Sequence, residues 1–203
     1  MSGSKINIVG IAGLGRSGKD TLANLFIQDG FYGVSFGDIT RDYSRQRHAN
    51  ELHPISRANL TETSNWLRKT RGPDVIMKIA LERYEEAIKT KDYKGLLTFS
   101  VRAPIEADFI LSHSGELIWI DVSDEVRYER AMNDLREGEP HLSFEEYMEH
   151  ENTQYEPLPD IPEEIQMNLP YVKSKATKHL ENDTENKEEF ITKAQALINS
   201  LKV

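Results

Sequence analysis

The chain has 203 residues, of which 38% are hydrophobic and 29% charged, a size that suits one domain over residues 1–203 with a sizeable core. Acidic residues outnumber basic ones by 34 to 25, and the net charge of −9 argues against a nucleic-acid partner held by a broad basic surface. The chain has no cysteine, which excludes disulfides, thiolate catalysis and cysteine-ligated zinc. It has no export signal and no apolar run near the roughly 20 residues of a membrane helix, so we expect a cytoplasmic protein without a membrane partner.

Strand and helix patterns alternate along the chain. In chain order, short apolar runs predict strands over residues 6–12, 34–36, 96–101, 117–122 and 178–181. Apolar residues at helical spacing predict helices over residues 22–30, 39–48, 60–71, 75–89, 105–111, 124–135, 143–151 and 187–201. This alternation predicts an α/β fold in three layers, a five-stranded parallel sheet with helices on both faces.

Two segments depart from the simple alternation. Residues 37–90 are mainly helical. Residues 136–171 are rich in Glu, Pro and Tyr, and Ser143 and Glu146 form a capping box for one short helix within them. We expect this second segment to be an insertion into the α/β fold.

A phosphate-binding loop is indicated between the first predicted strand and the first helix. Gly13 and Gly18 are five residues apart, and Lys19 follows directly. Backbone N–H groups converge on phosphate oxygens only where glycine conformations are available, and the helix N-terminus and Lys19 add positive potential. The residues predicted to bind the phosphates of ATP are Gly13, Gly15, Arg16, Ser17, Gly18, Lys19, Asp20 and Thr21.

The end of this loop resembles a family of enzymes. Gly18-Lys19-Asp20-Thr21 looks like the variant loop of some deoxynucleoside monophosphate kinases and phosphomevalonate kinases. Asp20 stands where Ser or Thr usually binds Mg²⁺, so Asp20 and Thr21 are the candidate metal ligands. The resemblance to the adenylate kinase, deoxynucleoside monophosphate kinase and dephospho-CoA kinase group spans nearly the whole chain. It implies a P-loop kinase fold with an acceptor-binding region at 37–90 and a helical lid at 136–171.

Two further segments resemble the acceptor side of these kinases. The sequence from Gly37 to Arg41 is similar to the Gly-Asp-x-x-Arg segment that opens the acceptor pocket, which implies that Arg41, with Asp38, binds the acceptor phosphate. The Ser-Asn-Trp-Leu-Arg sequence that ends at Arg68 looks like a helix of a kinase-like family related to dephospho-CoA kinases. Arg68 is therefore a candidate phosphate contact, and Trp66 either lines a base pocket or belongs to the core.

The third predicted strand ends in a segment that resembles the family's Asp-Gly-x-Arg sequence. The match implies that Arg102 is a phosphate-binding, catalytic arginine. Phe99 and Ser100 replace the family's Asp and Gly, so this strand lacks a carboxylate that usually helps to hold Mg²⁺. Asp20, Asp38 and Asp121 are the candidates to replace it, although Asp121 is also placed to cap the next helix.

The C-terminal third resembles the lid-side half of the family. Residues 120–130 are similar to the fourth strand and the helix that enters the lid, which implies that Arg130 lies by the ATP phosphates or stacks on adenine. Arg127 is either a further contact or an exposed charge, and Arg136 would have to supply the next lid arginine. Residues 180–184 resemble the loop that passes the adenine, which implies that Asn182 lies beside the base.

These resemblances predict ATP-dependent, Mg²⁺-assisted phosphoryl transfer to a nucleoside or deoxynucleoside monophosphate, with Lys19, Arg102 and Arg130 as catalytic residues. One alternative is a dephospho-CoA kinase, in which Asp38 would serve as the base for a hydroxyl acceptor. Another is a catalytically impaired, nucleotide-binding regulatory protein. The expected partners are small-molecule nucleotides, and the expected state is a monomer or homodimer.

Overall fold

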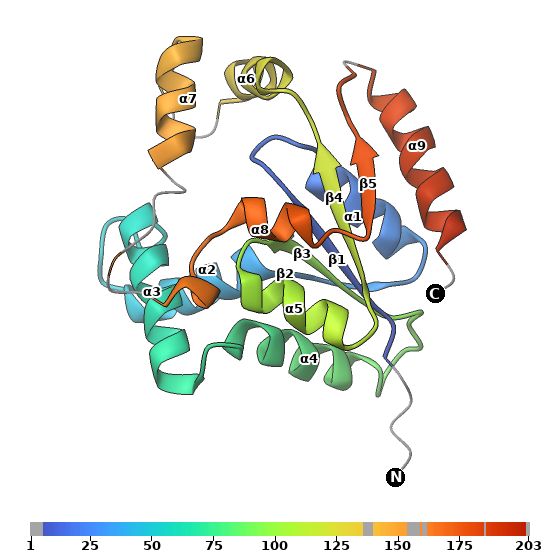
Figure 1. Ribbon diagram of the computed structural model, residues 1–203. Coiled ribbons are helices and arrows are strands. Elements are labelled where there is room, and N and C mark those ends of the chain that lie inside the picture. Colours follow the sequence, from blue (N-terminus) through green and yellow to red (C-terminus); the bar gives the residue numbers. More distant parts are fainter. Residues whose placement is uncertain (1–5, 136–139, 154–158, 160–161, 185, 202–203) are drawn as a thin grey trace.

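A computed structural model describes residues 6–135, 140–153, 159, 162–184 and 186–201 (Figure 1). Its centre is a five-stranded sheet in the order β2-β3-β1-β4-β5, and every neighbouring pair of strands is parallel. The strands are β1 (Ile8–Gly13), β2 (Tyr32–Ser35), β3 (Leu96–Val101), β4 (Glu116–Asp121) and β5 (Lys178–Glu181). The predicted five-stranded parallel sheet is confirmed.

Helices cover both faces of this sheet. In chain order they are α1 (Lys19–Gln28), α2 (Phe36–Arg47), α3 (Arg57–Arg71), α4 (Val75–Ala87), α5 (Pro104–Ser112), α6 (Asp124–Asn133), α7 (Phe144–Thr153), the short 3₁₀ helix η1 (Glu163–Ile165), α8 (Leu169–Ser174) and α9 (Lys187–Ser200). Figure 1 shows α1 and α9 together on one face and α4, α5 and α8 on the other. None of the described helices is long and apolar enough to cross a membrane.

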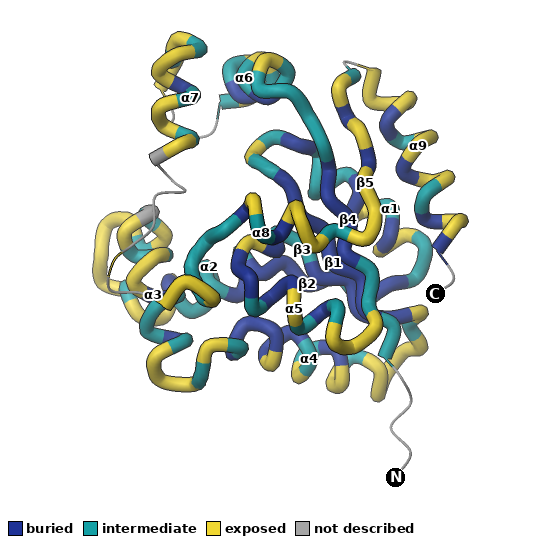
Figure 2. The backbone as a smooth tube through the Cα atoms, in the orientation of Figure 1, coloured by how far each residue is buried: buried dark blue, intermediate teal, exposed yellow. Residues whose placement is uncertain are grey.

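Alternation along the strands produces two separate hydrophobic cores. In β1, Ile8 and Ala12 pack into the core shared with α2, α3, α4, α5 and α8, whereas Val9 and Ile11 pack into the core shared with α1 and α9. Successive side chains of a strand point to opposite faces, so a strand buried on both sides is apolar throughout. Figure 2 shows the central strands as buried along most of their length.

The junction between β2 and α2 differs from the sequence prediction. A strand was expected over residues 34–36 and a helix from residue 39, but β2 ends at Ser35 and α2 begins at Phe36. The reason is local, because the Ser35 side chain accepts a hydrogen bond from the backbone N–H of Asp38 at 3.2 Å and so caps the helix. Asp38 therefore lies in the first turn of α2 and not in a loop before it.

The predicted insertion at 136–171 is only partly described. The capping box of α7 is confirmed, since Ser143 N–H donates to Glu146 at 2.8 Å and Glu146 N–H donates to Ser143 Oγ at 3.2 Å. Arg136 lies outside the described residues. Helix α8 was not predicted; it starts where Asn168 Oδ1 accepts from Tyr171 N–H at 2.9 Å.

Candidate active site

The predicted phosphate-binding loop, residues 13–18, joins β1 to α1 and has the glycine conformations that the sequence predicts. Gly13 and Gly18 have φ values of 149° and 94°, in the region that side chains disfavour. A Cβ on Gly18 would also lie 2.5 Å from Asn182 Nδ2, so no larger residue fits there without displacing that side chain. Gly18 is the N-cap of α1, which directs the N-terminus of this helix toward the loop.

Lys19 reaches back across this loop. Its Nζ donates to the backbone carbonyls of Gly13 at 3.0 Å and Leu14 at 2.5 Å, and it lies 3.4 Å from Ser17 Oγ. Burial, followed by the positive charge of Arg102, lowers the pKa of Lys19 to about 8. A polyphosphate beside this ammonium group would stabilise its charged form.

The loop forms one wall of a cavity of about 1300 Å³. All the residues predicted to bind the ATP phosphates line it, from Gly13 and Gly15 to Thr21. So do the predicted acceptor residues Asp38, Arg41 and Arg102, together with the predicted Arg130 and Asn182. Among the residues that the structure describes, Trp66 and Arg68 do not line this cavity. The structure therefore brings together the residues predicted on both sides of a phosphoryl transfer, except those on α3.

The predicted acceptor residues Arg41 and Asp38 are one turn apart on α2. The Arg41 guanidinium donates through Nε to Asp38 Oδ1 at 3.0 Å and also through Nη2. Both side chains line the cavity, and they are 39% and 56% exposed to solvent. The pair presents one cation and one carboxylate at the carboxyl end of β2, where ligands of parallel sheets bind.

Arg102 follows the end of β3 through an irregular backbone. The pairing of β1 with β3 skips Ser100, whose φ of 67° lies in the left-handed region that favours glycine. The resemblance places Gly at this position, and Gly is the residue that such a φ favours. Phe99, one residue earlier, lines the cavity with a ring where the family has a carboxylate.

The two α3 residues have structural partners. Arg68 Nη2 lies 3.1 Å from Glu106 Oε1, and both side chains are largely buried. Glu106 Oε2 in turn accepts from the backbone N–H of Arg102 at 2.8 Å. Arg68 thus supports the backbone of Arg102 through Glu106 and does not itself reach the cavity.

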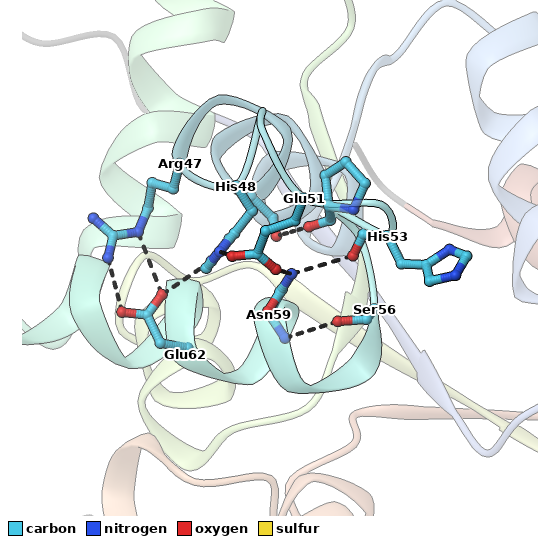
Figure 3. Close-up of polar contacts among 9 residues, drawn as sticks. Arg47, His48, Glu51, His53, Ser56, Asn59 and Glu62 are labelled. Carbon is cyan, nitrogen blue, oxygen red and sulfur yellow. Dashed lines mark hydrogen bonds and ion pairs between the residues drawn. The ribbon is translucent and has the colours of Figure 1, made fainter.

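Trp66 is part of a contact between α2 and α3. The Arg47 guanidinium lies 4.0 Å from the centroid of its ring. Arg47 also donates to Glu62 at 2.8 Å, and His48 lies between Glu62 and Glu51 (Figure 3). Of the two readings of Trp66, this arrangement supports the structural one, a partly buried ring packed against the core.

Arg130 and Asn182 line the cavity and donate hydrogen bonds to carbonyls of the predicted phosphate-binding loop. Arg130 donates to the backbone carbonyls of Arg16 at 3.2 Å, Asn182 at 2.9 Å and Thr184 at 2.8 Å. Asn182 is buried and donates through Nδ2 to the carbonyl of Ser17 at 2.8 Å. Burial lowers the pKa of Arg130. These contacts tie the loop after β5 to the phosphate-binding loop.

Arg127 is a functional candidate whose position the sequence left open. It is 1% exposed, so the reading as an exposed charge is wrong. Its Nε donates to the carbonyl of Gly15 at 2.9 Å, and its Nη1 pairs with Asp124 at 2.7 Å. Its Nη2 pairs with Glu151 of α7, a residue that sequence reasoning missed. Of these contacts, the sequence could have indicated only the pair with Asp124, because residues three apart on a helix are neighbours.

The donor set near Lys19 fits Mg²⁺. Asp20 and Thr21 offer a carboxylate and a hydroxyl in the first turn of α1, and both line the cavity. Within the described ranges, no group of three or more His, Cys, Asp or Glu side chains could hold a metal ion. Mg²⁺ needs no such group, because it is commonly held by one or two protein oxygens together with substrate phosphates and water.

Comparison with known sequences finds relatives without an assigned activity. No family model matches the chain. A UPF0200 protein of Methanococcus vannielii is 29% identical over 148 residues, which cover 72% of this chain and 76% of the relative. A UPF0200 protein of Pyrobaculum aerophilum is 27% identical over 91% of this chain and 92% of its own length.

Comparison with solved structures establishes the fold. TT1252 from Thermus thermophilus superimposes with a TM-score of 0.56 and 19% identity, over 98% of this chain and 100% of the other. Shikimate kinase from Bacteroides thetaiotaomicron superimposes with a TM-score of 0.51 and 15% identity, over 98% of this chain and 99% of the other. Dephospho-CoA kinase from Campylobacter jejuni superimposes with a TM-score of 0.51 and 14% identity, over 95% of this chain and 96% of the other. The chain has the α/β fold of P-loop kinases.

Proposed function

We propose that the protein is an ATP-dependent kinase whose acceptor is a nucleoside or deoxynucleoside monophosphate. The observation that supports this most is the shared cavity, which is lined by the phosphate-binding loop on one side and by Asp38, Arg41 and Arg102 on the other. The positive charge of Arg102 also contributes to the lowered pKa of Lys19, as expected for two cations that line one cavity. An acceptor that carries its own phosphate would need such arginines around it.

In the proposed reaction an oxygen of the acceptor phosphate attacks the γ-phosphorus of ATP. The bond between that phosphorus and the oxygen bridging to the β-phosphate breaks, and ADP leaves. Little covalent chemistry falls to the protein, so its contribution is to hold the two phosphates in line and to offset the negative charge between them. Lys19 and Arg102 are the cations we assign to the transferred group, and Arg41 is the one we assign to the acceptor phosphate.

Arg130 has a different part in this scheme. Its donors are directed to the carbonyls of Arg16, Asn182 and Thr184, so we assign it the positioning of the phosphate-binding loop. Asp20 and Thr21 are the residues we assign to a bound Mg²⁺, which would offset charge on the ATP phosphates.

A second acceptor chemistry is favoured by Asp38. Its carboxylate is 56% exposed, lines the cavity and pairs with Arg41 through Oδ1. In this chemistry the carboxylate would accept a proton from a hydroxyl group of the acceptor. This is the role that a dephospho-CoA kinase reaction would require.

The test is release of ADP from ATP and Mg²⁺ over a panel of acceptors, which includes all nucleoside and deoxynucleoside monophosphates and dephospho-CoA. Turnover with one or more monophosphates is the expected result. Turnover with dephospho-CoA alone would assign the hydroxyl-acceptor chemistry instead. ATP binding without turnover on any acceptor would contradict both and would favour a regulatory nucleotide-binding protein.

A further inference from the structure

A carboxylate of α7 lies against the phosphate-binding loop. Glu151 lines the same cavity as the loop, and a Cβ built on Gly15 would lie 3.3 Å from its Oε2. Its side chain is 13% exposed. The Glu151 charge is also felt at Lys19, where it opposes the dominant effect of burial on the lysine pKa. A negative charge of the protein itself therefore lies in this cavity, directly beside Gly15 of the loop.

Arg127 holds this carboxylate in place. The same guanidinium donates to the carbonyl of Gly15 at 2.9 Å, pairs with Asp124 at 2.7 Å and pairs with Glu151. Tyr147, one turn before Glu151 on α7, places its hydroxyl 3.5 Å from Nη2 of Arg127. One buried side chain thus links the phosphate-binding loop, α6 and α7.

A carboxylate and a phosphate oxygen are interchangeable partners for such a guanidinium. Both accept charge-assisted hydrogen bonds from its fork of N–H donors. They also repel each other, because two negative charges a few ångströms apart interact strongly where water is partly excluded. Glu151 and a nucleotide phosphate beside Gly15 would therefore disfavour each other.

We propose that Glu151 competes with the terminal phosphate of the nucleotide for the position beside Gly15 and Arg127. Binding of the nucleotide then displaces Glu151, transfers Arg127 to the phosphate and loosens the attachment of α7. In this scheme Glu151 lowers the affinity for the nucleotide, and the attachment of α7 depends on whether a nucleotide occupies the loop. The inference rests on ATP binding in the proposed function, but it does not depend on which acceptor is used.

The test compares ATP binding to the full chain and to Glu151→Gln by isothermal titration calorimetry. The variant keeps the shape of the side chain and removes its charge, so we expect ATP to bind about tenfold more tightly. Glu145→Gln is the matched control, because it removes the same charge from an exposed position on α7 and should leave the dissociation constant within twofold. Equal or weaker binding by Glu151→Gln would overturn the proposal.

Hydrogen exchange provides a readout that does not depend on affinity. ATP should increase amide exchange in α7 (Phe144–Thr153) of the unsubstituted protein, and should do so less in Glu151→Gln, whose helix is already held less firmly. Unchanged or slower exchange of α7 with ATP would contradict displacement. If none of the proteins binds ATP, the nucleotide-binding function itself is contradicted, and this inference with it.

Discussion

In the proposed function Lys19 must be charged to attract phosphate, yet its surroundings disfavour that charge. Burial and the nearby Arg102 lower its pKa to about 8. A bound polyphosphate stabilises the ammonium form, so the pKa in the complex is higher than in the free protein. Proton binding and nucleotide binding at this residue are therefore coupled.

The first prediction follows from the sign of this coupling. Below pH 8 the lysine is already charged in the free protein, so the ATP affinity should not depend on its titration. Between pH 8 and the higher pKa of the complex, each unit of pH should weaken ATP binding by up to about tenfold. Calorimetric titrations at pH 7.5, 8.5 and 9.5 measure this slope. Lys19→Arg is the control, since a guanidinium stays charged over the whole range and should abolish the slope. The same slope in both proteins would assign the effect to another group.

The second prediction at this scale separates the two sides of the cavity. Arg41→Met should raise the KM for the acceptor at least tenfold, because a charge-assisted hydrogen bond to its phosphate is lost, and should leave ATP affinity within twofold. Arg45→Met is the matched control on the same helix, since Arg45 is 56% exposed and pairs with Asp42 at 3.3 Å. Initial-rate kinetics with varied acceptor measure both variants. An equal effect of both substitutions would show that Arg41 does not contact the acceptor.

At the scale of single elements, local sequence predicted most of the strands and helices but not their junctions. The five strands and the capping box of α7 depend on residues close together in the sequence, so their patterns identify them. Phe36 has the pattern of a strand residue, and only the Ser35 hydroxyl, 3.2 Å from Asp38 N, shows that it opens a helix. Helix α8 has six residues, too few for a periodic pattern, and it forms because Leu169 and Val172 are buried against the sheet.

The third prediction tests the cap that starts α2. Ser35→Ala should lower the free energy of unfolding by about 1 kcal/mol, because the N–H of Asp38 loses its acceptor. Denaturant unfolding monitored by circular dichroism measures the change. Ser112→Ala is a suitable comparison, because that hydroxyl is exposed and donates within its own helix, and it should change stability by less than about 0.5 kcal/mol. Equal losses of unfolding free energy in Ser35→Ala and Ser112→Ala would show that the Ser35 cap does not stabilise α2.

At the scale of the whole molecule, the sequence predicted the parallel sheet and the glycine-rich turn between β1 and α1. It also placed Asp38, Arg41 and Arg102 near that turn, and all three line the cavity that the turn lines. It did not predict the long-range partners. Arg127 is buried by contacts with Gly15 and Glu151, and Arg68 is turned away from the cavity by Glu106. These partners come from other elements, and a single sequence contains no periodic signal for pairs so far apart.

The proposed function rests on all three scales, since the fold places Lys19, Arg41 and Arg102 around the same cavity. The most direct measurement uses ATP labelled in its γ-phosphate, with Mg²⁺ and each nucleoside monophosphate, and separates the products by chromatography. We predict that the label appears in a nucleoside diphosphate with the unsubstituted protein and not with Lys19→Ala. Label that stays in ATP or is recovered only as inorganic phosphate, with every monophosphate tested, would contradict the proposed transfer.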